Sequence, residues 1–171
     1  MENNIKGMVL LCAIVLTGLS AGLFYAWYVS VIPGTKRVAD HTYLETMQSI
    51  NRAILNPGFF IIFFGSLIML LISGYYQYLE NLHLPFYFIC TSIAFYMIGT
   101  LGITMFGNVP LNESLAPVNL SELSAEKLKS IRAAYEGRWN LFHAIRTLFS
   151  VLSFITLLIA AFINGSIASK I

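Results

Sequence analysis

The chain has 171 residues, of which 57% are hydrophobic and only 11% are Asp, Glu, Lys or Arg. This charged share is about half that of an average soluble domain, so the composition excludes an ordinary water-soluble protein and indicates a membrane protein. The formal net charge of +2 gives no reason to expect a nucleic-acid partner. The only partner that composition implies is the lipid bilayer.

Four apolar segments are predicted to span the membrane. The first, 7–32, carries no charge, and a helix of this length measures about 39 Å, enough to cross a hydrocarbon core of about 30 Å. The second and third predicted spans, 58–79 and 84–107, are also uncharged, and the connection of 80–85 between them is short enough for a helical hairpin. The fourth, 142–166, carries charge only near its beginning.

A first polar region separates the first two spans. Pro33-Gly34 predicts the end of the first helix, and Thr42 followed by Glu45 has the spacing of a capping box at the start of a short amphipathic helix. Its narrow apolar stripe favours a helix that rests on the membrane surface. The alternative is a helix folded over the mouth of the bundle.

A second polar region separates the last two spans. The segment 107–112 predicts a helix end, with Val109 extended before Pro110, so that Asn108 and Asn112 project to the same side. Two amides at the membrane boundary either line a partly dry pocket or cap backbone groups at the broken helix end. Further on, Asn119 and Glu122 have capping-box spacing before a second amphipathic helix, whose charged side chains are expected to form a solvated face: Glu122, Glu126, Lys127, Lys129 and Arg132.

These segments predict an all-α membrane protein, a single domain over residues 1–171 with four transmembrane helices in a bundle and two amphipathic helical segments on one face. Most cations lie in the two long polar segments, whereas the other face has Lys6 and Lys170. The positive-inside rule therefore predicts a multi-pass protein with its long polar segments in the cytoplasm.

The fourth span opens with a polar helix face. Trp139, His143 and Arg146 are spaced i, i+4, i+7, so they share one side of a helix. A cation at this depth is costly and indicates a function, unless it reaches the lipid headgroups as a structural anchor.

Standard catalytic motifs are absent from the sequence, including the P-loop, the dinucleotide-binding glycine pattern and the zinc-binding H-E-x-x-H. His41 and Glu45, with His143, offer one candidate metal site of two imidazoles and a carboxylate. A capping box at Thr42 would leave His41 outside the helix, so no bound metal or cofactor is predicted.

Several short motifs together resemble one family. They occur in order along nearly the whole chain: Ser30-Val31-Ile32-Pro33-Gly34, Gln48-Ser49-Ile50-Asn51, Asn56-Pro57, Asn108-Val109-Pro110-Leu111-Asn112, and Trp139 with His143, Arg146 and Thr147. This set is similar to that of the DUF1772, or anthrone oxygenase-like, family of small four-helix integral membrane proteins. That family more often has Asn where His143 stands.

The resemblance implies a cofactor-independent oxygenase, an oxidoreductase that acts on a lipophilic hydroxyaromatic small molecule. Such a reaction requires a base, a cation and amide donors. His143 is the candidate base and Arg146 the anion partner. Substrate binding is assigned to Asn51, Asn108, Asn112 and Trp139.

The alternative is a non-enzymatic four-helix membrane protein that binds a partner, a lipid or a small ligand at the bundle mouth, since membership of a fold family does not by itself imply its reaction. Small-molecule transport is disfavoured because no charged residue lies in the middle of a span.

Overall fold

The computed structural model describes residues 2–168, so Lys170 lies outside the described part. All regular elements there are helical, in the order α1 (Glu2–Ala26), η1 (Trp27–Val31), α2 (Ile32–Thr35), α3 (Asp40–Ala53), α4 (Pro57–Leu79), α5 (His83–Ala94), η2 (Phe95–Gly102), η3 (Thr104–Asn108), α6 (Val109–Leu115), η4 (Leu120–Glu122) and α7 (Ala125–Ala168). Four stretches are long and apolar enough to cross a membrane: Ile5–Thr35, Pro57–Leu79, His83–Leu115 and Ala125–Ser166. The prediction of an all-α membrane bundle is confirmed.

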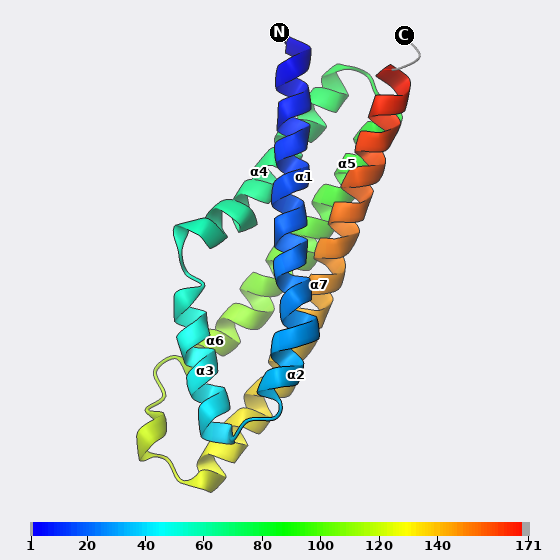
Figure 1. Cartoon of the computed structure of the whole chain (residues 1–171). Helices are drawn as coiled ribbons and strands as arrows, with labels where there is room; N and C mark the ends of the chain where they lie inside the picture. The colour runs from blue at the N-terminus through cyan, green and yellow to red at the C-terminus, as the bar shows by residue number, and fades with distance from the viewer. Residues whose placement is uncertain (1, 169–171) are drawn as a thin grey trace.

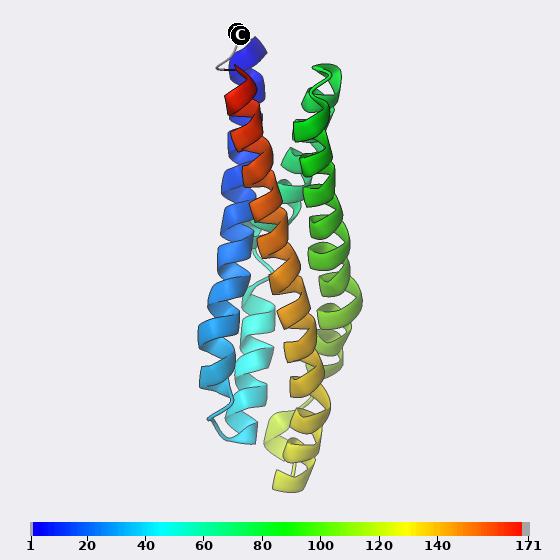
Figure 2. The ribbon, with the colours of Figure 1, turned by 90° about the vertical axis from the view of Figure 1, so that its right-hand side faces the viewer.

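The four long helices alternate in direction, and α3 and η4 lie at the end of the bundle opposite to the start of α1 and the end of α7 (Figures 1 and 2). α1 packs on α4 and α7, and α5 packs on the same two helices. One buried apolar cluster lies among the spans and consists of Ala13, Leu70, Ile89, Tyr96, Leu157 and Ala160. A second cluster, called the α3 core below, consists of Ile32, Tyr43, Leu44, Met47, Leu115, Leu120, Leu128, Tyr135 and Trp139.

Both prolines that were expected to end a span lie inside continuing helix. The π-helix η1 leads into α2, and η3 leads into α6, with Pro33 and Pro110 in the first turns of α2 and α6. In a continuing helix each proline removes one backbone N–H donor, and the local π-helical adjustments at η1 and η3 help the remaining backbone groups to find partners. Val109 has φ −60° and ψ −48°, so the extended conformation predicted for it is wrong and the third helical stretch runs on to Leu115.

Two glycines allow α7 to approach η2 and η3 closely. A Cβ atom at Gly99 would overlap the side chain of Phe149, and one at Gly107 would lie 2.7 Å from Cγ of Phe142. Both separations are far below ordinary van der Waals contact, so only glycine fits while these aromatic rings stay in place. The contact at Gly107 holds η3 against the part of α7 that carries the polar face.

The helix α3 packs on protein rather than on the membrane surface. It begins at Asp40 after Ala39, which makes no side-chain cap, so the predicted capping box at Thr42 is wrong. Its apolar stripe is almost fully buried, with Tyr43 1%, Leu44 0% and Met47 2% exposed. α6, η4 and α7 supply the opposing surface, which buries the stripe more completely than lipid headgroups would.

Arg132 joins α7 to the connection between α2 and α3, and the prediction that it belongs to a solvated face is wrong. Its Nη1 donates to the Val38 carbonyl at 2.7 Å and to Asp40 Oδ1 at 3.0 Å, and its Nε donates to Glu136 at 2.8 Å. The guanidinium also lies 4.5 Å from the ring centroid of Tyr43. Burial raises the pKa of the Tyr43 hydroxyl, so a neutral phenol lies beneath the cation.

The helix α7 is one unbroken rod of 44 residues, about 66 Å long, that includes both the second amphipathic segment and the fourth span. It does not begin at a capping box on Asn119, which makes no side-chain cap and precedes the short 3-10 helix η4. Ser124 Oγ instead accepts from the Lys127 backbone N–H at 3.4 Å. The polar face of Trp139, His143 and Arg146 therefore lies on the same continuous helix as the amphipathic segment, and the two parts hold a fixed orientation relative to each other.

Candidate functional site

A cavity of about 420 Å³ lies where α3, the first turns of α4, η3 with α6, and α7 meet beside α1. Most of its wall is apolar and largely aromatic, from residues that include Phe24, Trp27, Phe59, Phe60, Phe63 and Phe64. All six residues that the sequence assigned to a site line it: Asn51, Asn108, Asn112, Trp139, His143 and Arg146. The fold thus brings together side chains from three separate parts of the sequence.

Arg146 and His143 form a hydrogen-bonded pair one helical turn apart on α7. Arg146 Nε and Nη2 both approach His143 Nδ1, at 3.1 Å and 2.9 Å. Because an arginine only donates, Nδ1 is the acceptor and the ring proton lies on Nε2, which donates to the Phe24 carbonyl at 3.1 Å. The contacts therefore assign a neutral histidine with both nitrogens engaged.

The Arg146 guanidinium is a buried cation without a carboxylate neighbour in the described part of the chain. The residue is 8% exposed, and its remaining contacts are the Thr104 hydroxyl at 3.3 Å and two aromatic faces, those of Phe24 at 4.7 Å and Trp139 at 5.3 Å. No described Asp or Glu oxygen lies within ion-pair distance of it. The Nε and Nη2 donors of Arg146, an edge that in other proteins binds two carboxylate oxygens, here share the single lone pair of His143 Nδ1.

Aromatic contacts fix the orientation of His143. Its ring stacks on Trp139 with centroids 5.1 Å apart and planes 6° from parallel, and it meets Phe24 edge to face at 6.0 Å. Thr147 Oγ1 lies 3.5 Å from the same Phe24 carbonyl that accepts from His143. This carbonyl stands just before the π-helix η1, where the backbone pairing changes from i−4 to i−5, as the bond from Ile32 N to Trp27 O shows.

Asn108 holds η3 to α7 and presents a spare acceptor. Its Nδ2 donates to the Trp139 carbonyl at 3.1 Å, whereas its buried Oδ1 has no partner among the described residues. The residue is only 1% exposed. An unpaired buried acceptor is unfavourable, and a ligand hydroxyl that donates to it would relieve the cost.

Asn112 and Asn51 belong to one network that connects α6, α7 and α3. Asn112 Oδ1 accepts from the Tyr135 hydroxyl at 2.9 Å and from Trp139 Nε1 at 2.8 Å. Asn51 Nδ2 donates to the Tyr135 hydroxyl at 3.2 Å. The network fixes the orientation of the Trp139 indole at the cavity wall. Both asparagines that line the cavity here lie on helices, and neither lies on an extended segment.

Sequence reasoning missed three contributors to this site. Tyr135 lies one helical turn before Trp139, and that spacing was the available signal that its hydroxyl meets the same neighbours. Thr104 lies one turn before Asn108 on the same helical stretch, and that spacing was the available signal. No sequence pattern indicated that the Phe24 backbone carbonyl would accept a hydrogen bond from His143. This carbonyl is free to do so because of the π-helical turn that follows it.

The candidate metal site at His41 is not assembled in the described residues. His41 Nδ1 lies 3.8 Å from Glu45 Oε2, and both side chains are exposed, at 45% and 69%. His143 is 1% exposed and pairs with Arg146 and Phe24 instead. No group of three or more His, Cys, Asp or Glu residues suited to a metal ion occurs in the described part of the chain.

A family model described as anthrone oxygenase matches residues 59–156, which is more than half of the chain. The chain belongs to the anthrone oxygenase family. The family resemblance is thereby confirmed, and the matched range contains the motifs at 108–112 and 139–147 but not the three earlier ones. The family region contains five of the six predicted site residues, and Asn51 precedes it. Comparisons with curated proteins and with solved structures found no match.

Proposed function

We propose that this integral membrane protein is an oxidoreductase that uses dioxygen on a lipophilic hydroxyaromatic substrate. The observation that carries the proposal is the Arg146 guanidinium, a buried cation without an anionic partner among the described residues, at the polar end of an aromatic cavity. Burying an uncompensated charge is costly, so the site is best satisfied when a ligand supplies the anion. Family membership supports the same class of activity.

The cavity suits a flat, largely apolar molecule with oxygen atoms at one end. Its volume of about 420 Å³ falls within the usual range of about 300 to 1,000 Å³ for small-molecule sites. The rings of Phe59 and Phe63 stack with centroids 5.1 Å apart, and Phe24 meets Phe63 edge to face, so the wall is built of aromatic planes. Arg146 would bind an anionic oxygen, and Asn108 Oδ1 would accept from a neighbouring hydroxyl.

The proposed reaction converts an activated CH₂ group and O₂ into a carbonyl group and water. When the substrate oxygen takes the Nε and Nη2 donors of Arg146, the Nδ1 lone pair of His143 is released and accepts a C–H proton. The electron pair spreads to the oxygen at Arg146, which stabilises the anion. The carbanion then forms a C–O bond to O₂, which is reduced to a peroxide anion that takes the proton back from His143.

The last step converts the hydroperoxide into the carbonyl product and water. The second C–H proton leaves, the O–O bond breaks, and the departing hydroxide combines with that proton to give water and the carbonyl product. His143 is the proposed base in both proton removals, and Asn51, Asn108, Asn112 and Trp139 are proposed to hold the substrate. In this scheme the protein supplies positioning and charge, and O₂ is the only oxidant.

A second candidate function is binding without turnover, as in a non-enzymatic membrane protein that holds a lipid or a small ligand at the bundle mouth. One specific observation favours it. Both ring nitrogens of His143 are engaged by protein groups, the Phe24 carbonyl and Arg146, so the residue offers no free base in this arrangement. In this case Arg146 would bind the ligand oxygen and His143 would only orient Arg146.

Oxygen uptake separates the two candidates. Purified protein in detergent, with an autoxidisable hydroxyanthrone as substrate, is expected to accelerate oxygen consumption in the presence of a chelator and without added flavin. A matched sample of Arg146→Met controls for uncatalysed oxidation. Ligand binding without turnover would instead support the second candidate, and activity abolished by the chelator would indicate a metal-dependent reaction.

We also propose that the end carrying α3 and η4 faces the cytoplasm, because most Lys and Arg residues lie there, including Lys36, Arg37 and Lys129. Ser130 is exposed on α7 near this end. A Ser130→Cys variant in a Cys12→Ser, Cys90→Ser background is expected to resist a membrane-impermeant maleimide in intact cells and to react in inverted vesicles. Labelling in intact cells would reverse the orientation.

A further inference from the structure

We infer that the cavity takes its ligand directly from the hydrocarbon of the bilayer, through a lateral opening between α4 and η3. The inference rests on the proposed function, because it concerns how a lipophilic hydroxyaromatic reaches Arg146. The opening is bordered by three side chains, called the portal residues: Phe60 and Phe64 on α4 and Met105 on η3.

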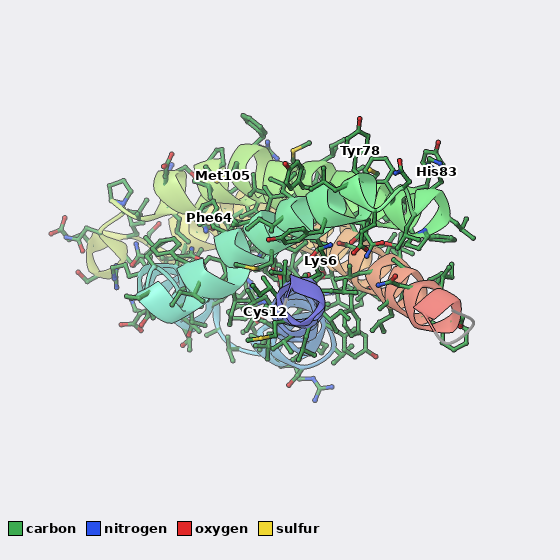
Figure 3. The ribbon with its side chains drawn as sticks, turned by 90° about the horizontal axis from the view of Figure 1, so that it is seen from above. Lys6, Cys12, Phe64, Tyr78, His83 and Met105 are labelled. Carbon is green, nitrogen blue, oxygen red and sulfur yellow. The ribbon has the colours of Figure 1, made fainter. Side chains whose placement is uncertain are left out.

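The portal residues face two environments. All three line the cavity, and all three are partly exposed, with Phe60 at 40%, Phe64 at 41% and Met105 at 43%. They belong to the spans Pro57–Leu79 and His83–Leu115, so their outer surfaces face acyl chains. Figure 3 labels Phe64 and Met105 on neighbouring helices of the bundle. These apolar side chains separate the cavity from lipid. An apolar molecule that passes them stays in apolar surroundings, so its transfer costs little free energy.

The helices on either side of the portal residues do not pack closely along their length. α4 packs on α1 and α5, but its contacts with η3 and α6 are few. Its first turns diverge from the rest of the bundle, as Figure 1 shows. Side chains at this edge are therefore able to change rotamer without disturbing a helix-helix interface.

The α3 core covers part of the route from the aqueous side. That cluster lies beyond the polar end of the cavity and includes Trp139 itself. Gln48 ties α3 to the chain after α6, because its Nε2 donates to the carbonyls of Leu115 and Val118 at 2.9 Å each. Arg52 and Glu113 also line the cavity, so the headgroup-level edge that they mark is the competing way in.

The test is kinetic and uses 1,8-dihydroxyanthraquinone, a probe that the proposed reaction does not consume, with protein reconstituted in liposomes. In Met105→Trp the association and dissociation rate constants are expected to fall together by about tenfold, a barrier higher by about 1.4 kcal/mol. The Kd should stay within about twofold, because a portal changes rates and not the bound state. Phe64→Ala, which widens the opening, should raise both rates.

Ile98→Trp is the matched control, since Ile98 is 67% exposed on η2 of the same span and does not line the cavity. It should leave both rates unchanged. Unchanged rates in Met105→Trp and Phe64→Ala, with probe binding intact, would overturn the portal and leave the proposed function standing. The portal is also overturned if Arg52→Trp slows entry and the portal variants do not. Failure of the wild-type protein to bind the probe would overturn the proposed function and the portal with it.

Discussion

Arg146→Lys is expected to lower the affinity for an anionic hydroxyaromatic by about tenfold or more. The guanidinium meets His143 with two N–H groups and Thr104 with a third, and a lysine ammonium does not reproduce this planar fork. Loss of one charge-assisted contact costs about 1.5 to 3 kcal/mol, which corresponds to about tenfold or more in Kd. Titration with the anthraquinone probe in liposomes measures the change.

The matched control is Arg138→Lys on the exposed face of the same helix, for which no change is expected. Arg146→Met adds a second readout, because replacing a buried, unpaired cation with an apolar side chain of similar length is often neutral or stabilising. We therefore expect it to abolish probe binding and to leave the thermal unfolding temperature unchanged or raised. Equal probe affinity in Arg146→Lys and Arg138→Lys would remove Arg146 from the site.

His143→Asn is expected to reduce turnover by about 10² to 10⁴, the usual contribution of a positioned general base. The amide oxygen of asparagine offers Arg146 an acceptor in place of Nδ1. Probe affinity should therefore stay within about threefold of the wild-type value, a difference of less than about 1 kcal/mol. Initial rates of oxygen uptake, measured beside probe binding, separate the two effects.

Leu141→Asn is the matched control for the introduction of an amide on α7, since Leu141 is 59% exposed and lies outside the cavity lining. It should change neither turnover nor affinity. If His143→Asn keeps full turnover, His143 is not the base and acts only by orienting Arg146. If it loses probe binding instead, the histidine is required to hold the guanidinium in place.

Hydrophobic pattern alone predicted the four spanning helices, because a run of apolar residues long enough to cross lipid has few other solutions. The pattern did not predict how the helices end. A proline favours extended backbone in the residue before it. In the structure Pro33 and Pro110 nevertheless lie in helices α2 and α6, directly after the π-helical segments η1 and η3. A π-helical turn is stabilised by packing from other helices, and local sequence carries little of that information.

Part of the candidate site was also predictable. Trp139, His143 and Arg146 share a helix face, so their spacing was sufficient to place them together. Asn51 and Asn108 joined them through the family resemblance, since no local pattern relates α3 to η3. For α3 the sequence favoured the membrane surface over the mouth of the bundle, and it missed the role of Arg132, because an amphipathic stripe does not reveal whether lipid or protein covers it.

The ionisation of the bound probe tests most directly whether Arg146 binds an aromatic oxyanion. The visible absorbance of 1,8-dihydroxyanthraquinone follows deprotonation of its phenol, and it is titrated in liposomes with and without protein. We predict that the bound phenol has a pKa lower by at least about one unit, worth about 1.4 kcal/mol, and that this shift is smaller in Arg146→Lys at probe and protein concentrations that saturate the variant. A bound probe that titrates as it does in protein-free liposomes would contradict the claim.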